Sequence, residues 1–445
     1  MSKNDPHILG KESIGKLLLQ YSIPAIIGMT ITSIYNIIDS IFIGHGVGPM
    51  AIAGLAISFP LMNLVVAFCT LVSAGGSTLA SIRLGQKDMK GATEILSHTL
   101  MLCITNSFFF GILVFFGASN ETLPYARSFM QVILLGTPIT YTMIGLNNVM
   151  RATGYPKKAM LTSMVTVVAN IILAPIFIFH FEWGMRGAAT ATVISQLIGM
   201  VWVVSHFVKK DSTVHFEGNI WKMKRRIVES IFAIGMSPFL MNVCACAIVI
   251  IINNSLQNYG GDMAIGAYGI INRLLTLYVM IVLGLTMGMQ PIVGYNFGAQ
   301  KIDRVKQTLR LGIISGVVIT SSGFIICEFF PHAVSALFTD SDELIDLAVD
   351  GIRLAVLMFP FVGAQIVIGN FFQSIGKAKI SIFLSLTRQL LYLLPCLLLF
   401  PNWWGLEGIW ISMPVSDALA FITAVVSLMI YIKKVSKQHP ETVAE

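Results

Sequence analysis

Long apolar runs alternate with short polar stretches along almost the whole chain of 445 residues. A helix needs about 20 apolar residues to cross the ~30 Å hydrocarbon core of a bilayer. The pattern therefore predicts twelve membrane-spanning helices, at residues 17–44, 51–80, 93–117, 125–150, 160–180, 187–208, 229–256, 264–293, 308–330, 344–374, 380–400 and 406–432.

The two halves of this pattern resemble each other. Residues 51–54 (AIAG) are matched by 264–267 (AIGA), 213 positions later, and 183–187 (WGMRG) are matched by 404–408 (WGLEG), 221 positions later. The longest polar interval, at 206–229, separates the two copies. Because each copy holds an even number of helices, both enter the membrane in the same orientation, as in transporters built from parallel repeats.

The sequence thus predicts an all-α polytopic membrane protein. Its twelve helices form two six-helix lobes that are related by a pseudo-two-fold axis along the membrane normal. We place the lobes at 1–208 and 229–433, a cytoplasmic linker at 209–228 and a cytoplasmic tail at 434–445.

Charge supports this topology and gives it a direction. Only 11% of the residues are charged, against about 25% in an ordinary soluble domain. Of the 29 basic residues, 24 lie in the termini and in the loops that follow even-numbered helices. Loops rich in Lys and Arg stay in the cytoplasm, so both termini of this multi-pass protein are expected there. The net charge of +7 is explained in this way without a nucleic-acid partner.

The first apolar segment contains one carboxylate, Asp39. A charge at membrane depth costs roughly 2.5 to 3.5 kcal/mol, so such a residue indicates a functional site that faces a cavity or a partner. Asn36 lies one helical turn before it. The alternative is an interfacial aspartate near the end of the helix. The functional hypothesis is that protonation of Asp39 and release of a substrate are linked.

Four motifs together give the chain a family resemblance. They are Ile38-Asp-Ser-Ile-Phe-Ile-Gly44, the loop Gly85-Gln-Lys-Asp88, Arg151-Ala-Thr-Gly154 and the stretch from Trp183 to Thr192. With the two-lobe plan, they resemble the MATE (multidrug and toxic compound extrusion) family, and most of all its bacterial branch that includes DinF and MepA. The resemblance implies a cation-coupled antiporter of the bacterial inner membrane that exports drugs, commonly cationic amphiphiles, in exchange for Na⁺ or H⁺. We expect it to act as a monomer.

The resemblance also implies a cation site in the first lobe. In that branch the site combines an acid on the first helix, an Asn and an Asp one turn apart on the fifth, and a Thr on the sixth. Asp39, Asn170 and Thr192 match three of these positions, with Asn36 one turn before Asp39 and Thr190 as the alternative to Thr192. Ala174 stands where the second Asp is expected. A site with one acid holds Na⁺ less well and still carries a proton, so H⁺ is favoured as the coupling ion. If the ion were Na⁺, Asp39 would be its ligand, and no other cofactor is expected.

Further polar residues lie within apolar segments. Four amides are candidates for lining a substrate cavity: Asn147, Asn148, Gln365 and Asn370. In the second lobe, Asp417 is expected to be buried and paired with Arg388 or Arg273, because a buried charge needs a partner.

Several function classes are excluded or disfavoured. No nucleophile, base or Gly-rich phosphate-binding loop is recognisable, so the chain is not expected to be an enzyme or to hydrolyse ATP. The six cysteines lie inside apolar segments and are expected to be core residues. One alternative is a lipid-linked oligosaccharide flippase of the same superfamily, which would need more buried basic residues than Arg273 and Arg388. A membrane-embedded transferase would need paired carboxylates on cytoplasmic loops, which carry only isolated acids.

Overall fold

The computed structural model describes residues 6–47, 49–117, 124–209, 212–217, 223–338 and 341–438, and describes the side chains there except at 6–7, 32–41, 43–61, 108–128, 262 and 435–438. These residues form helices joined by short turns, and no strand occurs among them. Within the described part of the chain, ten helices are long and apolar enough to cross a membrane, or eleven if one bent pair counts as a single span.

The first half contains a short 3-10 turn and six long helices. In chain order they are η1 (Pro6–Gly10), α1 (Ile14–Val47), α2 (Pro49–Gly85), α3 (Met89–Gly117), α4 (Pro124–Ala152), α5 (Pro156–Pro175) with its π-helical extension η2 (Ile176–His180), and α6 (Gly184–Val208). Each predicted segment of this half corresponds to one of these helices.

The second half repeats the arrangement with more breaks. In chain order it comprises α7 (Arg225–Gly298), α8 (Ile302–Phe329), α9 (Pro331–Ala336), α10 (Asp342–Ala355), α11 (Phe359–Ser374), α12 (Ala378–Leu386), the π-helical turn η3 (Thr387–Leu393), α13 (Leu394–Leu399) and α14 (Pro401–Gln438). α7 is two spans joined at Gly261, whose φ of 64° only glycine adopts easily. α7 and α14 extend beyond the lobe limits of 229 and 433 expected from the sequence.

One predicted span differs from the structure. The segment expected at 344–374 is not a continuous helix, because α10 and α11 meet at an angle of 55°. Pro360 lies in the first turn of α11. A proline has no N–H to donate to the preceding turn, so it is tolerated at the start of a helix and disfavoured inside one.

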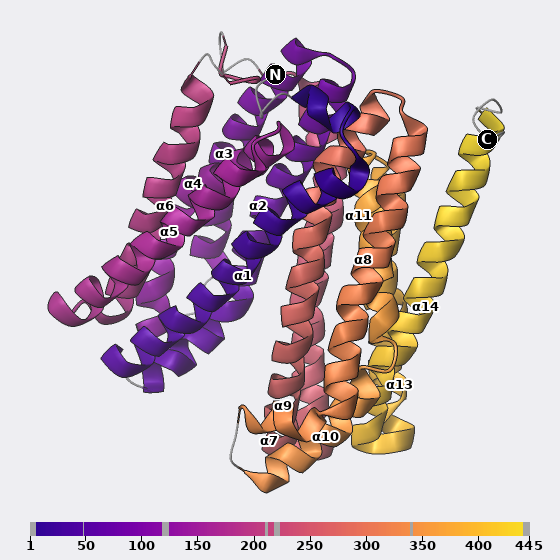
Figure 1. Cartoon of the computed structure of the whole chain (residues 1–445). Coiled ribbons are helices and arrows are strands. Elements are labelled where there is room, and N and C mark those ends of the chain that lie inside the picture. Colours follow the sequence, from indigo (N-terminus) through magenta and orange to yellow (C-terminus); the bar gives the residue numbers. More distant parts are fainter. Residues whose placement is uncertain are drawn as a thin grey trace.

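The two halves form two bundles that lie side by side (Figure 1). The bundles lie close together at the end that carries both chain termini and diverge toward the opposite end. We call the first end the terminal face; it includes the turns after α2, α7 and α11, at Gln86, Ala299 and Ile375.

Close contacts between glycines and backbone reveal the symmetry that relates the bundles. A Cβ atom on Gly85 of α2 would lie 1.9 Å from the carbonyl oxygen of Tyr295 on α7, and one on Gly298 of α7 would lie 2.1 Å from the carbonyl oxygen of Ile82 on α2. Gly298 follows Gly85 by 213 residues, and Ile82 precedes Tyr295 by the same number. The two contacts therefore exchange under the repeat, so the pseudo-two-fold axis passes between α2 and the second span of α7.

A hydrogen bond lies on the same axis. The Gln290 side-chain amide on α7 donates to the hydroxyl oxygen of Ser77 on α2 over 3.1 Å, and also to that of Thr78. Ser77 is the counterpart of Gln290 at the same offset of 213. A residue can touch its own counterpart only close to the axis, so this bond marks the centre of the seam between the lobes.

The first prediction concerns this seam. Gly85→Ala is expected to destabilise the protein by roughly 1 to 3 kcal/mol, because the new methyl group meets backbone that cannot move away as a side chain could. The melting temperature of the purified protein measures the loss. Gly269→Ala is the matched control, since a Cβ there meets nothing within 4 Å. Equal melting temperatures for the two variants would contradict a tightly closed seam.

Candidate functional site

Three polar side chains of the first lobe form a buried cluster between α5 and α6. The Asn170 side-chain amide donates to the hydroxyl oxygens of Thr192 at 3.2 Å and Ser195 at 3.5 Å. The exposed fractions of the three residues are 3%, 8% and 1%. The Thr192 hydroxyl donates in turn to the carbonyl oxygen of Ala188 over 3.1 Å, and the Ser195 hydroxyl to that of Thr192 over 2.8 Å. The cluster is thus a fixed set of neutral oxygen atoms inside the lobe.

Asn170 and Thr192 were selected from the sequence, whereas Ser195 was missed. Ser195 follows Thr192 by three residues, so both project from one face of α6. That spacing was a signal for Ser195, but small hydroxyl residues are common in membrane helices and the spacing alone does not single it out.

Asp39 and Asn36 lie within α1, but their side chains are outside the described residues. The described side chain closest to Asp39 along the sequence is that of Phe42, one helical turn later. Its ring meets that of Phe179 edge to face, with centroids 6.4 Å apart, and it packs against the apolar cluster that contains Ala174. Near Phe42, α1 therefore runs alongside η2, the extension of α5.

Ala174 occupies the position where the family pattern expects a second acid. It is fully buried in an apolar cluster with Phe129, Ile133 and Ile178. A carboxylate there would lose its hydration without gaining a partner from this cluster. No group of three or more His, Cys, Asp or Glu side chains that could hold a metal ion occurs in the part of the chain that the structure describes.

The four candidate cavity amides lie on two helices, one in each lobe. Asn147 and Asn148 lie on α4 of the first lobe, and Gln365 and Asn370 lie on α11 of the second. Asn147 donates to the carbonyl oxygen of Ala159 over 3.2 Å, and Asn370 donates to that of Ile366 over 3.0 Å. Two of the four amides thus bind local backbone, and a cavity-lining role stays a prediction for all four.

In the second lobe Asp417 on α14 forms an ion pair with Arg388 of η3. The guanidinium Nε donates to the carboxylate Oδ1 over 2.7 Å, and the Asp417 side chain is 8% exposed. The expected burial of Arg273 is wrong: its side chain is exposed, and it makes no ion pair with any described residue. The reason is the rotation of α7, an almost uniformly apolar helix whose sequence does not indicate which face is outside.

One member of the ion pair has a neutral counterpart in the first lobe. Gln196 on α6 precedes Asp417 by 221 residues, the offset that also relates the Trp183 and Trp404 stretches. The same offset carries Arg388 onto Val167 of α5, which cannot form an ion pair. The Gln196 side-chain oxygen instead accepts a hydrogen bond from the hydroxyl of Thr140 on α4, so the ion pair has no equivalent at the matching positions of the first lobe.

Arg151 was assigned to a loop from the sequence, but it ends α4 and is 8% exposed. One guanidinium nitrogen lies 3.2 Å from the side-chain oxygen of Asn148 and 3.5 Å from the sulfur of Met287 on α7. No described acid forms an ion pair with it. Arg151 thus connects the first lobe to the seam, a role that depends on a residue 136 positions away in the chain.

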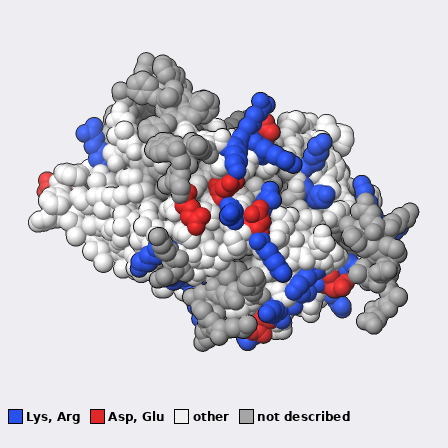
Figure 2. Space-filling model, turned by 90° about the horizontal axis from the view of Figure 1, so that it is seen from above, with Lys and Arg blue, Asp and Glu red and all other residues white. Residues whose placement is uncertain are grey.

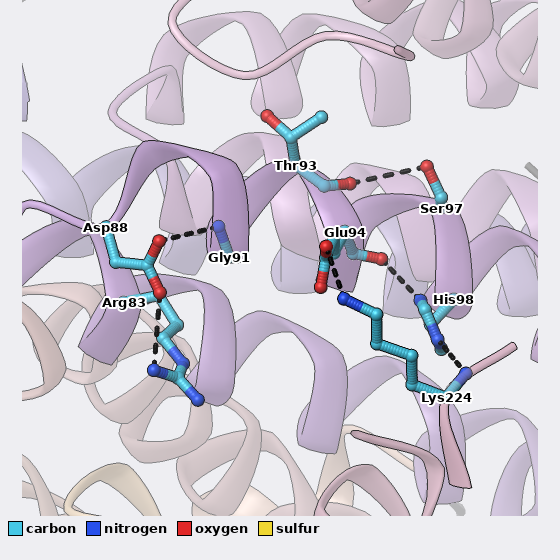
Figure 3. A network of polar contacts seen from close by, with 8 residues as sticks. All are labelled: Arg83, Asp88, Gly91, Thr93, Glu94, Ser97, His98 and Lys224. Carbon is cyan, nitrogen blue, oxygen red and sulfur yellow. Dashed lines mark hydrogen bonds and ion pairs between the residues drawn. The ribbon is translucent and has the colours of Figure 1, made fainter. Parts of the chain in front are cut away.

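The linker between the lobes is attached to α3 by the network in Figure 3. The Lys224 ammonium meets the Glu94 carboxylate at 2.6 Å, and the Lys224 backbone N–H donates to His98 Nε2 over 2.7 Å. His98 Nδ1 lies 2.6 Å from the Glu94 carbonyl oxygen, which can only accept, so Nδ1 carries the proton. His98 is thus neutral and holds the linker in place. In the loop between α2 and α3, Arg83 forms a separate ion pair with Asp88 at 3.3 Å.

A second prediction follows for this network. His98→Ala is expected to destabilise the protein by about 1 to 3 kcal/mol, because the Lys224 N–H loses its acceptor. Hydrogen exchange of the linker and the melting temperature measure the effect. Ser97→Ala is the control, because the Ser97 hydroxyl only donates to the Thr93 carbonyl oxygen within its own helix. If both variants exchange at the wild-type rate, the linker is held by other contacts.

Comparisons with known proteins agree with this architecture. The family model MatE matches residues 24–176 and 235–398, one match in each lobe. The multidrug export protein MepA of Staphylococcus haemolyticus (strain JCSC1435) is 28% identical over 422 residues, which cover 93% of this chain and 93% of MepA. MepA of Staphylococcus aureus (strain MSSA476) is 26% identical over 435 residues, with coverages of 95% and 94%.

Solved structures show the same fold. A crystal structure of MATE in complex with MaL6 superimposes with a TM-score of 0.91 at 23% identity, and covers 98% of this chain and 100% of that one. An outward-facing multidrug resistance MATE family transporter gives 0.88 at 24% identity, with coverages of 96% and 98%. The predicted fold class, twelve membrane helices in two six-helix lobes, is confirmed. With a family model that matches both lobes, the chain belongs to the MatE family.

Proposed function

We propose that this chain is a cation-coupled antiporter that exports organic cations by alternating access of its two lobes, with H⁺ rather than Na⁺ as the coupling ion. Its family consists of transporters, so the chain is a multi-pass membrane transporter and not an enzyme. The relatives MepA are named multidrug export proteins, and this supports drug-like substrates for the present chain.

The observation that carries the proposal is the Asn170, Thr192 and Ser195 cluster. It lies inside the first lobe, close in the fold to the outer part of α5 along which α1 brings Asp39. Neutral oxygens can orient an acid on a neighbouring helix and stabilise both its charged and its protonated forms, since hydroxyls can donate as well as accept. Such an environment suits a group that must gain and lose a proton in each transport cycle.

The choice of H⁺ rests on the charge of the site. A bare Na⁺ that leaves water needs several oxygen ligands and favours negative charge, whereas a proton needs one acid. The position of the second family acid is filled by Ala174 in an apolar cluster. Asp39 is then the one carboxylate of the proposed site, and a monomer suffices because all its members come from one lobe.

Alternating access is supported by the seam. The lobes touch at Gly85, Gly298 and Gln290 near the terminal face and diverge at the other end (Figure 1). If the basic loops stay in the cytoplasm, as the distribution of Lys and Arg predicts, this arrangement is closed toward the cytoplasm in the bacterial inner membrane.

Transport into inverted membrane vesicles tests the proposal. Under an imposed pH gradient with an acidic interior, an H⁺ antiporter accumulates ethidium inside as protons leave, and a Na⁺ gradient at constant pH has no effect. Accumulation driven by Na⁺ alone would refute the choice of ion while keeping the antiporter. Absence of accumulation under both gradients would argue against organic cations as substrates.

A further inference from the structure

An apolar groove of about 350 Å³ lies on the second lobe at the terminal face. One wall is the first part of α8, with Val305, Leu309 and Ile313, and the other is the end of α14, with Leu428 and Tyr431. Phe371 of α11 is also part of the lining. Lys306 and Arg310, one turn apart on α8, are the charged residues of the groove.

The same position in the first lobe is filled by the chain itself. The repeat counterparts of Leu309 and Leu428 are Leu96 on α3 and Phe207 on α6, and both are 0% exposed. The linker covers them: the Phe216 backbone N–H donates to the Phe207 carbonyl oxygen over 3.0 Å, and their rings lie 6.0 Å apart. Val214 of the linker is 1% exposed and packs into the same cluster.

No described segment covers the second-lobe copy. Ile314 is 49% exposed, whereas its counterpart Met101 is 7% exposed. α6 ends at Val208, where the chain turns back over the first lobe, but α14 continues as a helix to Gln438, beyond the groove. The first lobe thus fills this site with an apolar segment of its own chain, whereas none of the described residues fills the second-lobe copy.

The charges indicate what kind of occupant fits. Lys306 and Arg310 form no ion pair with any described residue. Their counterparts in the first lobe, where the linker is the occupant, are the neutral Thr93 and Ser97, which hydrogen-bond within α3 (Figure 3). Figure 2 shows that Lys and Arg side chains gather over this end of the molecule. An occupant of the second-lobe groove is therefore apolar along its length and negative at one end.

We infer that the groove binds an anionic phospholipid, with an acyl chain along Leu309, Ile313 and Leu428 and the phosphate group between Lys306 and Arg310. Both cations lie in the first three turns of α8, the part of a membrane helix nearest the lipid head groups, where each basic residue attracts anionic lipid. The inference concerns a site on the outside of one lobe and does not depend on the coupling ion or the exported substrate.

Lipid binding to the purified full-length protein in detergent tests whether Lys306 and Arg310 recognise the anionic head group. Native mass spectrometry and melting temperature are followed during titration with dioleoylphosphatidylglycerol and, separately, dioleoylphosphatidylcholine. We expect one tightly held phosphatidylglycerol that raises the melting temperature, and no comparable effect of phosphatidylcholine. The double variant K306Q/R310Q is expected to weaken phosphatidylglycerol binding at least tenfold. The control K377Q/K379Q removes two other exposed cations from the terminal face and is expected to bind like the wild type.

Three further measurements test the acyl-chain part. Ile314→Trp fills the groove and leaves both cations in place, so it is expected to weaken phosphatidylglycerol binding with a lipid-free melting temperature close to that of the wild type. Inorganic phosphate at the same concentration is expected to have no effect; protection equal to that of the lipid would identify a free-anion site instead. Deletion of residues 439–445 is expected to leave binding unchanged. The inference is overturned if both lipids bind equally, if neither variant alters binding, or if that deletion increases binding tenfold, since the tail would then be the occupant.

Discussion

Asp39→Asn is expected to abolish ethidium accumulation driven by a pH gradient, which is the largest effect on activity that we predict. The asparagine keeps the size and polarity of the side chain but can neither bind nor release a proton. If transport is coupled through this acid, an imposed gradient has no group on which to act. Accumulation in vesicles with an acidic interior, compared at equal amounts of wild type and variant, measures the effect.

The control separates coupling from folding. The free energy of unfolding of the variant is expected to lie within about 1 kcal/mol of the wild-type value, because an uncharged side chain costs less at membrane depth than a charged one. The melting temperature measures it. Binding of ethidium to the purified variant should persist and become independent of pH, whereas wild-type binding weakens as the pH falls. Accumulation at the wild-type rate in the variant would show that another group couples the gradient to transport.

A matched variant tests the Asn170, Thr192 and Ser195 cluster, which the proposal links to this acid. Ser195→Ala removes one hydroxyl that accepts from Asn170 and keeps the helix. A role in orienting Asp39 would shift the pH at which transport is half-maximal, whereas a role in packing alone would change stability and leave that pH unaltered. The two readouts keep the proposed coupling separate from the integrity of the α5–α6 contact.

Hydrophobic segments and internal repeats made most of this fold predictable. Twelve apolar runs are long enough to span a bilayer, and the repeat between the two halves predicted a symmetry axis. The structure shows that Ser77 and Gln290, which are related by the offset of 213, meet on this axis. The sequence indicated a bend at Pro360, which matches Pro138 at an offset of 222, but not that the span divides there into α10 and α11. A proline in a membrane segment can start a new helix or only bend an existing one, and neighbouring helices decide between the two.

The candidate site was less predictable, because burial in a membrane protein depends on helix rotation and on distant partners. Asn170 and Thr192 could be paired by resemblance, and they do meet at 3.2 Å. Arg273 was expected to be buried, but its side chain is exposed. Arg151 was assigned to a loop, but it is buried at the seam. A helix that is apolar on all sides carries no periodic signal that would orient a single arginine.

Asp417→Asn is expected to cause the largest loss of stability, on the order of 3 to 5 kcal/mol, because it leaves the Arg388 guanidinium without its counter-ion inside the membrane region of the second lobe. The structure gives a direct Nε–Oδ1 contact of 2.7 Å, with the Asp417 side chain 8% exposed and the Arg388 side chain 33% exposed. Because the arginine is only partly buried, the loss is expected at the lower end of this range. The melting temperature of the purified protein measures this loss.

The reverse variant, Arg388→Met, is expected to cost less than Asp417→Asn. An aspartate left alone can take up a proton and become neutral, whereas a guanidinium cannot lose one. The melting temperatures of the two variants are compared under the same conditions. The double variant R388M/D417L removes both charges and is expected to lie near the wild type, because replacing a whole buried pair by apolar groups is often neutral. If it is as stable as the wild type but inactive, the pair takes part in transport rather than only joining η3 to α14. If it is as unstable as Asp417→Asn, the expectation that a fully apolar pair is neutral is wrong.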